Sequence, residues 1–166
     1  MHFKSEHAQN ILRAVSPDLK LVSVSPATGA FTNEVRVLEC RTRSGKSLRL
    51  AVKLITDDDA WDALLRASAD FHGLQVARAY GIPAPEPLYL DPTGDVLGAP
   101  GIVTRMVEGR QIAAPENVGD WAESLADLLL KIHDVRPNEQ EREHLYDGND
   151  LGLYFLTRDY PERMAG

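Results

Sequence analysis

The stretch LRLAVKLIT, residues 48–56, places a lysine in the middle of an otherwise apolar segment. Leu, Val and Ile dominate the stretch and a Ser-Gly turn precedes it, which predicts a β-strand. A buried ammonium group is costly unless another group pairs with it. Lys53 therefore has two explanations. Either it lies on an edge strand, with its stem on apolar surface and its ammonium in water, or it belongs to a binding site.

The composition is that of an ordinary globular protein, and the chain is long enough for one domain with a hydrophobic core. Of the 166 residues, 43% are hydrophobic and 26% are charged. The net charge of −7 argues against nucleic-acid binding as the main activity and is compatible with a cationic substrate. The apolar runs are too short to span a bilayer, and the N-terminal residues lack the apolar segment of a secretory signal. Because Cys40 is the single cysteine, no intrachain disulfide can form, and we expect a cytoplasmic protein without a membrane partner.

The pattern of the whole chain predicts an α+β fold with a mostly antiparallel sheet of about five strands. In chain order, the predicted elements are a helix at 5–15, strands at 19–25, 34–43 and 48–56, a helix at 60–80, strands at 87–91 and 101–109, and a helix at 116–135. The segment TGAFTN, 28–33, is the predicted turn between the first two strands. GIPAPEP, 81–87, cannot continue the long helix. Residues 136–166 predict no clear element.

The surroundings of Lys53 favour a nucleotide site. Side chains two apart on a strand share a face, so Ala51 and Lys53 point the same way. The small side chain leaves room for a flat base, while the lysine can reach phosphate groups. The 28–33 turn can lie over those phosphates with its backbone N–H groups. It has one glycine, Gly29, and matches neither GxGxxG nor a Walker A loop, so an ordinary hairpin turn fits it equally well.

Five pieces in a consistent order resemble the aminoglycoside phosphotransferase family, a branch of the protein-kinase-like fold. They are TGAFTNEVRV, LAVKLI, RAYGIPAPEPLYLD, GIVTRMVEGRQI and LADLLLKIHDV. The segment GIPAPEP ahead of a strand is the most characteristic of them. The resemblance implies a nucleotide-binding N-terminal lobe over residues 1–107, with a hinge at its end. It also implies that 108–166 hold a linker and the first helix of an incomplete C-terminal lobe.

The resemblance implies roles for several residues in binding ATP or GTP. Lys53 matches the lysine that contacts the α- and β-phosphates and is held by an acidic residue on the following helix. Asp70 is the nearest acidic candidate, although it is one methylene shorter than the usual glutamate and also fits a surface position. The other implied contacts are Thr32 and Asn33 in the turn, Val35 and Ala51 on the strands, Thr104 at the back of the adenine pocket, and Arg105, Met106 and Val107 on the hinge. For Met106 and Val107, ordinary strand packing is the alternative.

The catalytic motifs of the family are missing from these 166 residues. The family uses His-Gly-Asp, with an asparagine five residues after the aspartate, and a later aspartate that binds magnesium. His133 and Asp134 followed by Asn138 have the wrong spacing, and the family's histidine at this helix end is structural. We therefore expect no catalytic residue and no metal ligand here, with the Mg²⁺ ligands outside this sequence. The chain resembles the front half of such an enzyme and is expected to be inactive alone.

Two classes of function remain open. The first is the nucleotide-binding portion of a small-molecule kinase, whose acceptor is a hydroxyl of an aminoglycoside or another small alcohol. The second is a degenerate, non-catalytic kinase-like lobe that acts as a binding or interaction module. Self-association is also expected, because a wide uncovered apolar stripe tends to find a partner. That stripe lies on the 116–135 helix and consists of Trp121, Leu125, Leu128, Leu129 and Ile132.

Overall fold

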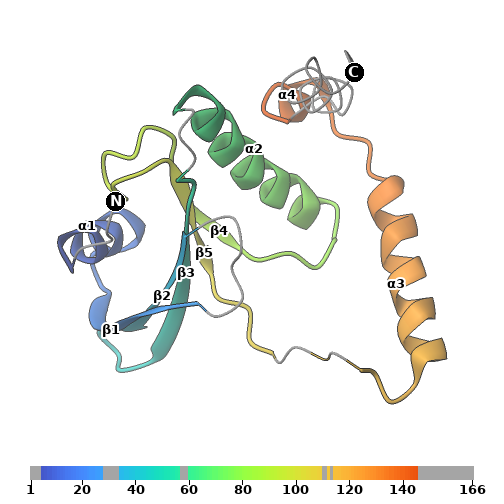
Figure 1. Cartoon of the computed structure of the whole chain (residues 1–166), viewed down its shortest axis with the longest axis horizontal. Coiled ribbons are helices and arrows are strands. Elements are labelled where there is room, and N and C mark those ends of the chain that lie inside the picture. The colour runs from blue at the N-terminus through green and yellow to red at the C-terminus, as the bar shows by residue number, and fades with distance from the viewer. Residues whose placement is uncertain (1–4, 28–33, 57–59, 110–111, 113, 146–166) are drawn as a thin grey trace, which may run out of the picture.

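The computed structural model describes residues 5–27, 34–56, 60–109, 112 and 114–145. They form a five-stranded antiparallel sheet with a helix on each face, and a further helix that stands apart from the sheet (Figure 1). This arrangement confirms the predicted α+β fold and matches a kinase-like N-terminal lobe. The elements are α1 (Ser5–Val15), β1 (Lys20–Pro26), β2 (Glu34–Arg41), β3 (Ser47–Leu54), α2 (Ala60–Ala79), β4 (Pro87–Asp91), β5 (Gly101–Arg105), α3 (Val118–His133) and α4 (Glu139–Arg142).

The strand order places β3 at the centre of the sheet. The order is β1-β2-β3-β5-β4, so β3 pairs with β2 on one side and with β5 on the other. Lys53 lies opposite Val35 on β2 and opposite Ile102 on β5. The edge-strand explanation of Lys53 is therefore wrong. The continuous apolar run around this lysine reflects a central strand with a helix over each face, and such strands lose the simple alternation of a half-exposed strand.

The main core lies between α1 and one face of the sheet. Leu50 and Val52 alternate on β3 and are fully buried on this face. Their burial holds the central strand in register, because a shift by one residue would turn both side chains to the other face. The core also contains Ala8, Ile11 and Leu12 of α1, with Leu38, Cys40, Leu54, Leu97 and Val103.

The opposite face of the sheet carries α2. Ile55 and Lys53 are two residues apart and point to this same face. The helix is held there by a small buried cluster of Ile55, Ala63 and Ala67, against which Leu90 packs. Because the cluster is small, α2 covers only part of the face. Val35, Ala51 and Lys53 remain half-buried, which leaves this part of the sheet accessible to a ligand.

Two segments differ from the sequence-based prediction. The last strand was predicted to reach residue 109, but β5 ends at Arg105, and only one further bond, from the Met106 N–H to the Arg49 carbonyl at 2.9 Å, continues the pairing. The short helix α4 was not predicted at all. It begins with a capping box, in which Asn138 Oδ1 accepts from the Glu141 N–H and Glu141 Oε2 accepts from the Asn138 N–H. The sequence signal for it is this Asn-x-x-Glu spacing.

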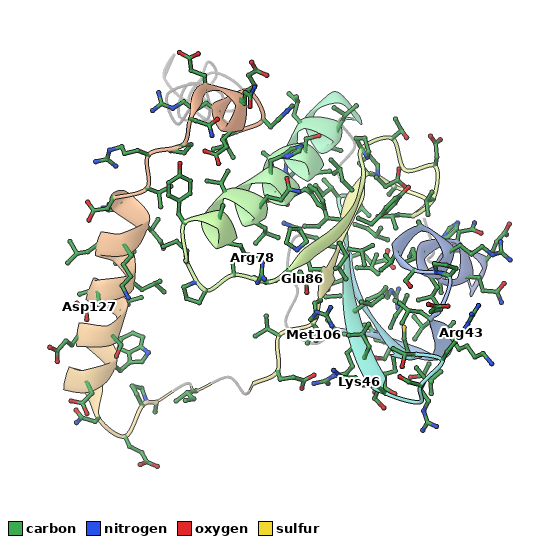
Figure 2. The ribbon with its side chains drawn as sticks, turned by 180° about the vertical axis from the view of Figure 1, so that it is seen from behind. Arg43, Lys46, Arg78, Glu86, Met106 and Asp127 are labelled. Atoms are coloured by element: carbon green, nitrogen blue, oxygen red, sulfur yellow. The ribbon has the colours of Figure 1, made fainter. Side chains whose placement is uncertain are left out.

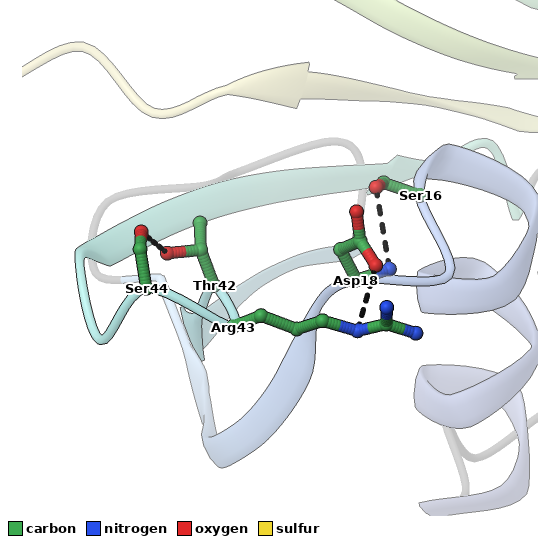
Figure 3. Close-up of polar contacts among 5 residues, drawn as sticks. All are labelled: Ser16, Asp18, Thr42, Arg43 and Ser44. Atoms are coloured by element: carbon green, nitrogen blue, oxygen red, sulfur yellow. Dashed lines mark hydrogen bonds and ion pairs between the residues drawn. The ribbon is translucent and has the colours of Figure 1, made fainter.

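Polar side chains fix the turns of the sheet. The carboxylate of Asp91 is 3% exposed and accepts four backbone N–H groups of the turn that follows it. These bonds satisfy the buried charge without a basic partner. At the β2–β3 hairpin, Arg43 Nε lies 2.9 Å from Asp18 Oδ1 and links the hairpin to the turn between α1 and β1 (Figure 3). Both of these side chains are exposed, so this ion pair contributes little to stability.

The helix α3 stands away from the sheet (Figure 1). Asn117 caps it, since its Oδ1 accepts from the N–H groups of Gly119 and Asp120. No residue of α3 is buried by the described part of the chain. Its large exposed apolar side chains are Val118, Trp121, Leu125, Leu129, Leu130 and Ile132. Across the described ranges, no helix combines the length and the apolar character needed to cross a membrane. The division into lobes at residue 107 remains a prediction.

Candidate functional site

The centre of the candidate site is an ion pair between the central strand and the helix over it. Lys53 Nζ lies 2.6 Å from Asp70 Oδ2. The side chains are 35% and 38% exposed, so the pair is neither sealed in the core nor fully solvated. The ammonium has three N–H groups, and the hydrogen bond to Asp70 uses one of them. A half-exposed, oriented cation on a sheet face can therefore accept an anionic ligand from the solvent side.

Small residues on α2 lie on the same helix face as Asp70, the partner of Lys53. Ala63, Ala67 and Asp70 follow one another at spacings of four and three residues, so they share one face of the helix. Both alanines are buried against the sheet. They pack there with Ile55 and Leu90, and from this position on the helix the Asp70 carboxylate reaches the Lys53 ammonium. The predicted acidic partner of Lys53 is thus in contact with it.

The strand register brings further predicted site residues onto the same face as Lys53. Ala51 lies opposite Thr104 on β5, and Lys53 lies opposite Val35 on β2. Directly opposed residues of an antiparallel pair point to the same side of the sheet. Val35, Ala51, Lys53 and Thr104 therefore form one continuous surface. Thr104 is the most buried of them, at 8% exposure. The remaining two predicted loop contacts, Thr32 and Asn33, lie outside the described residues.

The hinge residues differ in what their backbone groups offer. The Arg105 N–H donates to the carbonyl of Glu86 at 2.8 Å, and the Met106 N–H donates to the carbonyl of Arg49 at 2.9 Å. Figure 2 shows Met106 where the chain leaves the sheet. Val107 is 61% exposed, and its N–H has no hydrogen bond within the described ranges. Among the three predicted hinge residues, Val107 is therefore the one whose N–H is left for a ligand.

The side chain of Arg105 pairs with Glu86. Its Nε lies 2.5 Å from Glu86 Oε2, in an exposed ion pair that joins the start of β4 to the end of β5. The backbone N–H of the same residue also bonds to Glu86. Arg105 thus ties the end of β5 to Glu86, the residue before β4, through both its backbone and its side chain.

Sequence reasoning missed a second ion pair beside the hinge. Arg49 Nε donates to Glu108 Oε1 at 2.9 Å, and Arg49 Nη2 bonds to Glu108 Oε2. The hydrogen bond and the charge of Glu108 raise the pKa of Arg49 above its ordinary value. A surface cavity of about 250 Å³ lies beside this pair and is not lined by Lys53. The sequence signal was an arginine near the start of β3 and a glutamate shortly after the end of β5, the strand that pairs with β3.

The described residues do not form a metal site. Within those ranges no group of three or more His, Cys, Asp or Glu side chains is placed to hold a metal ion. The described site consists of the Lys53–Asp70 ion pair and the shorter side chains of Val35, Ala51 and Thr104. It can hold an anionic, flat ligand, while the groups that would bind magnesium are not among the residues gathered here.

Comparison with known proteins identifies the family of the chain. A search of curated proteins found no match. A family model described as the phosphotransferase enzyme family matches residues 24–163, which is most of the chain. The matched region includes the central strand with Lys53, the helix with Asp70, the hinge and α3. The match confirms the family resemblance seen in the sequence, and this chain belongs to the phosphotransferase enzyme family.

Proposed function

We propose that the sheet face around Lys53 binds ATP or GTP. In this proposal, the chain is the nucleotide-binding portion of a kinase that transfers the γ-phosphate to a hydroxyl of a small molecule. The observation that carries the proposal is the Lys53–Asp70 ion pair on the central strand, with Nζ 2.6 Å from Oδ2. Family membership supports the general class of phosphotransfer.

The ion pair supports a role in holding phosphate groups. Asp70 keeps the ammonium oriented and takes one of its three N–H groups. The other two can donate to phosphate oxygens, and hydrogen bonds between charged groups are stronger than neutral ones. A lysine retained for packing alone would need no carboxylate partner on a neighbouring helix. The half-exposure of both side chains gives the phosphates access from solvent.

The rest of the face supports a role in holding the base. Ala51 presents only a methyl group beside Lys53, with Val35 and Thr104 on the adjoining strands. A flat ring can lie against Val35, Ala51 and Thr104 because their side chains are short, with the longer Lys53 side chain beside it. At the edge, the N–H of Val107 is free of hydrogen bonds in the described part of the chain and can donate to a ring nitrogen. Phosphates and base would thus be held at opposite ends of one face.

Binding of this kind does not by itself accelerate phosphoryl transfer. Interactions that hold substrate and transition state equally well leave the chemical step unchanged. Transfer needs an aligned hydroxyl and charge stabilisation, which the family supplies through a catalytic aspartate and Mg²⁺. The catalytic motif of the family does not occur in this sequence, and the described ranges hold no cluster of metal-binding side chains. The missing motif also fits the second candidate, a degenerate, non-catalytic kinase-like lobe that acts as a binding or interaction module.

Calorimetric titration with ATP and with GTP tests the proposal. We expect wild-type protein to bind at least one of them and Lys53→Ala to bind it about tenfold or more weakly, because hydrogen bonds to charged groups contribute about 1.5–3 kcal/mol. Lys46→Ala is the matched control, since Lys46 is an exposed lysine on the β2–β3 hairpin, labelled in Figure 2. Equal affinity of wild type and Lys53→Ala would contradict the proposal.

A further inference from the structure

We propose that Arg49 and Glu108 are a pair of positioning residues for the base of the nucleotide. Together they would hold the hinge segment 106–108 against β3 and so fix the direction of the Val107 N–H. This inference rests on the proposed function, because it concerns how the same site recognises the base. It adds two residues to the four already described: Arg49, which is two residues from Ala51 and so shares its face of β3, and Glu108 on the hinge segment.

Arg49 contacts the hinge segment at two points, one through its backbone and one through its side chain. Its carbonyl accepts the Met106 N–H at 2.9 Å. Its guanidinium donates to both carboxylate oxygens of Glu108, with Nε 2.9 Å from Oε1. The two contacts lie on either side of Val107. A single residue of the central strand therefore holds both neighbours of Val107, whose N–H has no partner in the described ranges.

The remaining charges around Arg49 keep its side chain in place. Glu39 lies opposite Arg49 on β2, and its charge, like that of Glu108, raises the pKa of Arg49. Glu39 also accepts a hydrogen bond from Ser23 Oγ at 3.0 Å, which ties it to β1. Arg49 thus sits between one carboxylate held by the sheet and one carried by the hinge. A planar guanidinium that binds a carboxylate through two nitrogens restrains direction as well as distance.

A general contribution to stability would not require this arrangement. The Glu108 side chain is 72% exposed and that of Arg49 is 40% exposed, and exposed ion pairs contribute little to folding. The pairing of β3 with β5 does not depend on this ion pair either, because the ladder already extends to the pair Leu50 and Arg105. What the pair adds is a restraint on the three residues just beyond that ladder.

The test compares a ligand that has a base with one that has none. Wild type, Arg49→Gln, Glu108→Gln and the double variant are titrated calorimetrically with ATP and GTP and, separately, with inorganic triphosphate. We expect each single variant to bind the nucleotide about threefold to fivefold more weakly, the range open to an exposed ion pair. The double variant should lose no more than either single one, since both residues act through each other. Binding of inorganic triphosphate should be unchanged in all three.

Two controls separate this inference from the proposed function. Asp18→Asn removes another exposed arginine–carboxylate pair, Asp18 with Arg43, and should bind as wild type does (Figure 3). Lys53→Ala should weaken both nucleotide and triphosphate. Three results would overturn the inference and leave the proposed function intact. They are an unchanged nucleotide affinity in the Arg49 and Glu108 variants, a loss of affinity in the double variant equal to the sum of the two single losses, and an equal loss of affinity for triphosphate. A wild-type chain that binds neither ATP nor GTP would overturn both.

Discussion

Lys53 on the central strand and Asp70 on the helix above it form an ion pair with 2.6 Å between Nζ and Oδ2. The pair joins the two elements that enclose the accessible part of the sheet face. Asp70 shares its face of the helix with Ala63 and Ala67, which are buried in a cluster with Ile55. A half-exposed lysine with a fixed carboxylate partner is an arrangement suited to holding phosphate, and the predictions below start from it.

The first prediction concerns Asp70. Asp70→Asn should weaken ATP or GTP binding, but less than Lys53→Ala does, because the phosphate donor remains and only its orientation is relaxed. The free energy of unfolding should change by less than about 1 kcal/mol, since both side chains are more than one third exposed. Calorimetry and urea unfolding measure the two effects.

Asp70→Glu is the control for this prediction, because it keeps the charge and should keep most of the binding. A large loss of stability in Asp70→Asn with unchanged nucleotide affinity would give the ion pair a structural role instead.

The second prediction concerns the exposed stripe of α3. Trp121, Leu125, Leu129 and Ile132 are between 41% and 51% exposed. We propose that this stripe drives self-association, because apolar surface gains free energy when it leaves water. Sedimentation velocity should show a sedimentation coefficient that rises with concentration. Leu125→Gln with Leu129→Gln should lower that rise, whereas a wild type that is monomeric at every concentration would contradict the prediction.

The third prediction concerns Cys40 and pH. Burial raises the pKa of the Cys40 thiol to about 11 from an ordinary value of 9.0. The thiolate is therefore disfavoured in the folded state, and an unfolded chain ionises first. The free energy of unfolding should fall as pH rises from about 9 to 11. Cys40→Ala removes this contribution. The difference in free energy of unfolding between wild type and Cys40→Ala should therefore narrow between about pH 9 and 11. A difference that stays constant with pH would contradict the assignment.

The fourth prediction concerns turnover. The 166-residue chain should transfer no phosphate to aminoglycosides or small alcohols in a radiolabelled γ-phosphate assay with magnesium, because no motif of the family's catalytic loop occurs in it. Turnover that disappears in Lys53→Ala would show that a catalytic carboxylate is present, with Asp134, Asp147 and Asp150 the first to examine. Activity that arises when a downstream lobe is joined to the chain would support the reading of an N-terminal half.

The sequence predicts much of this fold because its signals are local. Strand alternation, the GIPAPEP break and the helical spacing of Trp121 and Leu125 placed every major element within a few residues. The position of Lys53 at the centre of the sheet was harder, because the order of strands depends on pairings between distant segments. Residue patterns alone were compatible with Lys53 on an edge strand, whereas the family resemblance favoured Lys53 in a nucleotide-binding site.

The contacts beside the hinge could not be predicted from the sequence. Arg49 and Glu108 are 59 positions apart and meet only because β3 and β5 are neighbours in the sheet. Whether Asp70 reaches Lys53 likewise depends on how closely α2 approaches the sheet, which is set by the packing of Ala63 and Ala67. Side-chain reach of this kind follows from tertiary packing, and propensities and motifs do not contain it.

The central claim is that nucleotide phosphates bind at Lys53, and site-specific lysine labelling tests it most directly. An acyl phosphate of ATP transfers its acyl group to a nearby lysine amine and releases ATP, so the modified residue reports where the phosphates lie. The sequence contains five lysines, Lys4, Lys20, Lys46, Lys53 and Lys131, which mass spectrometry can quantify separately. We predict preferential acylation of Lys53 that excess ATP suppresses, with the other four unaffected by ATP. Equal acylation of all five, or ATP protection at Lys20 or Lys46 and not at Lys53, would contradict the account.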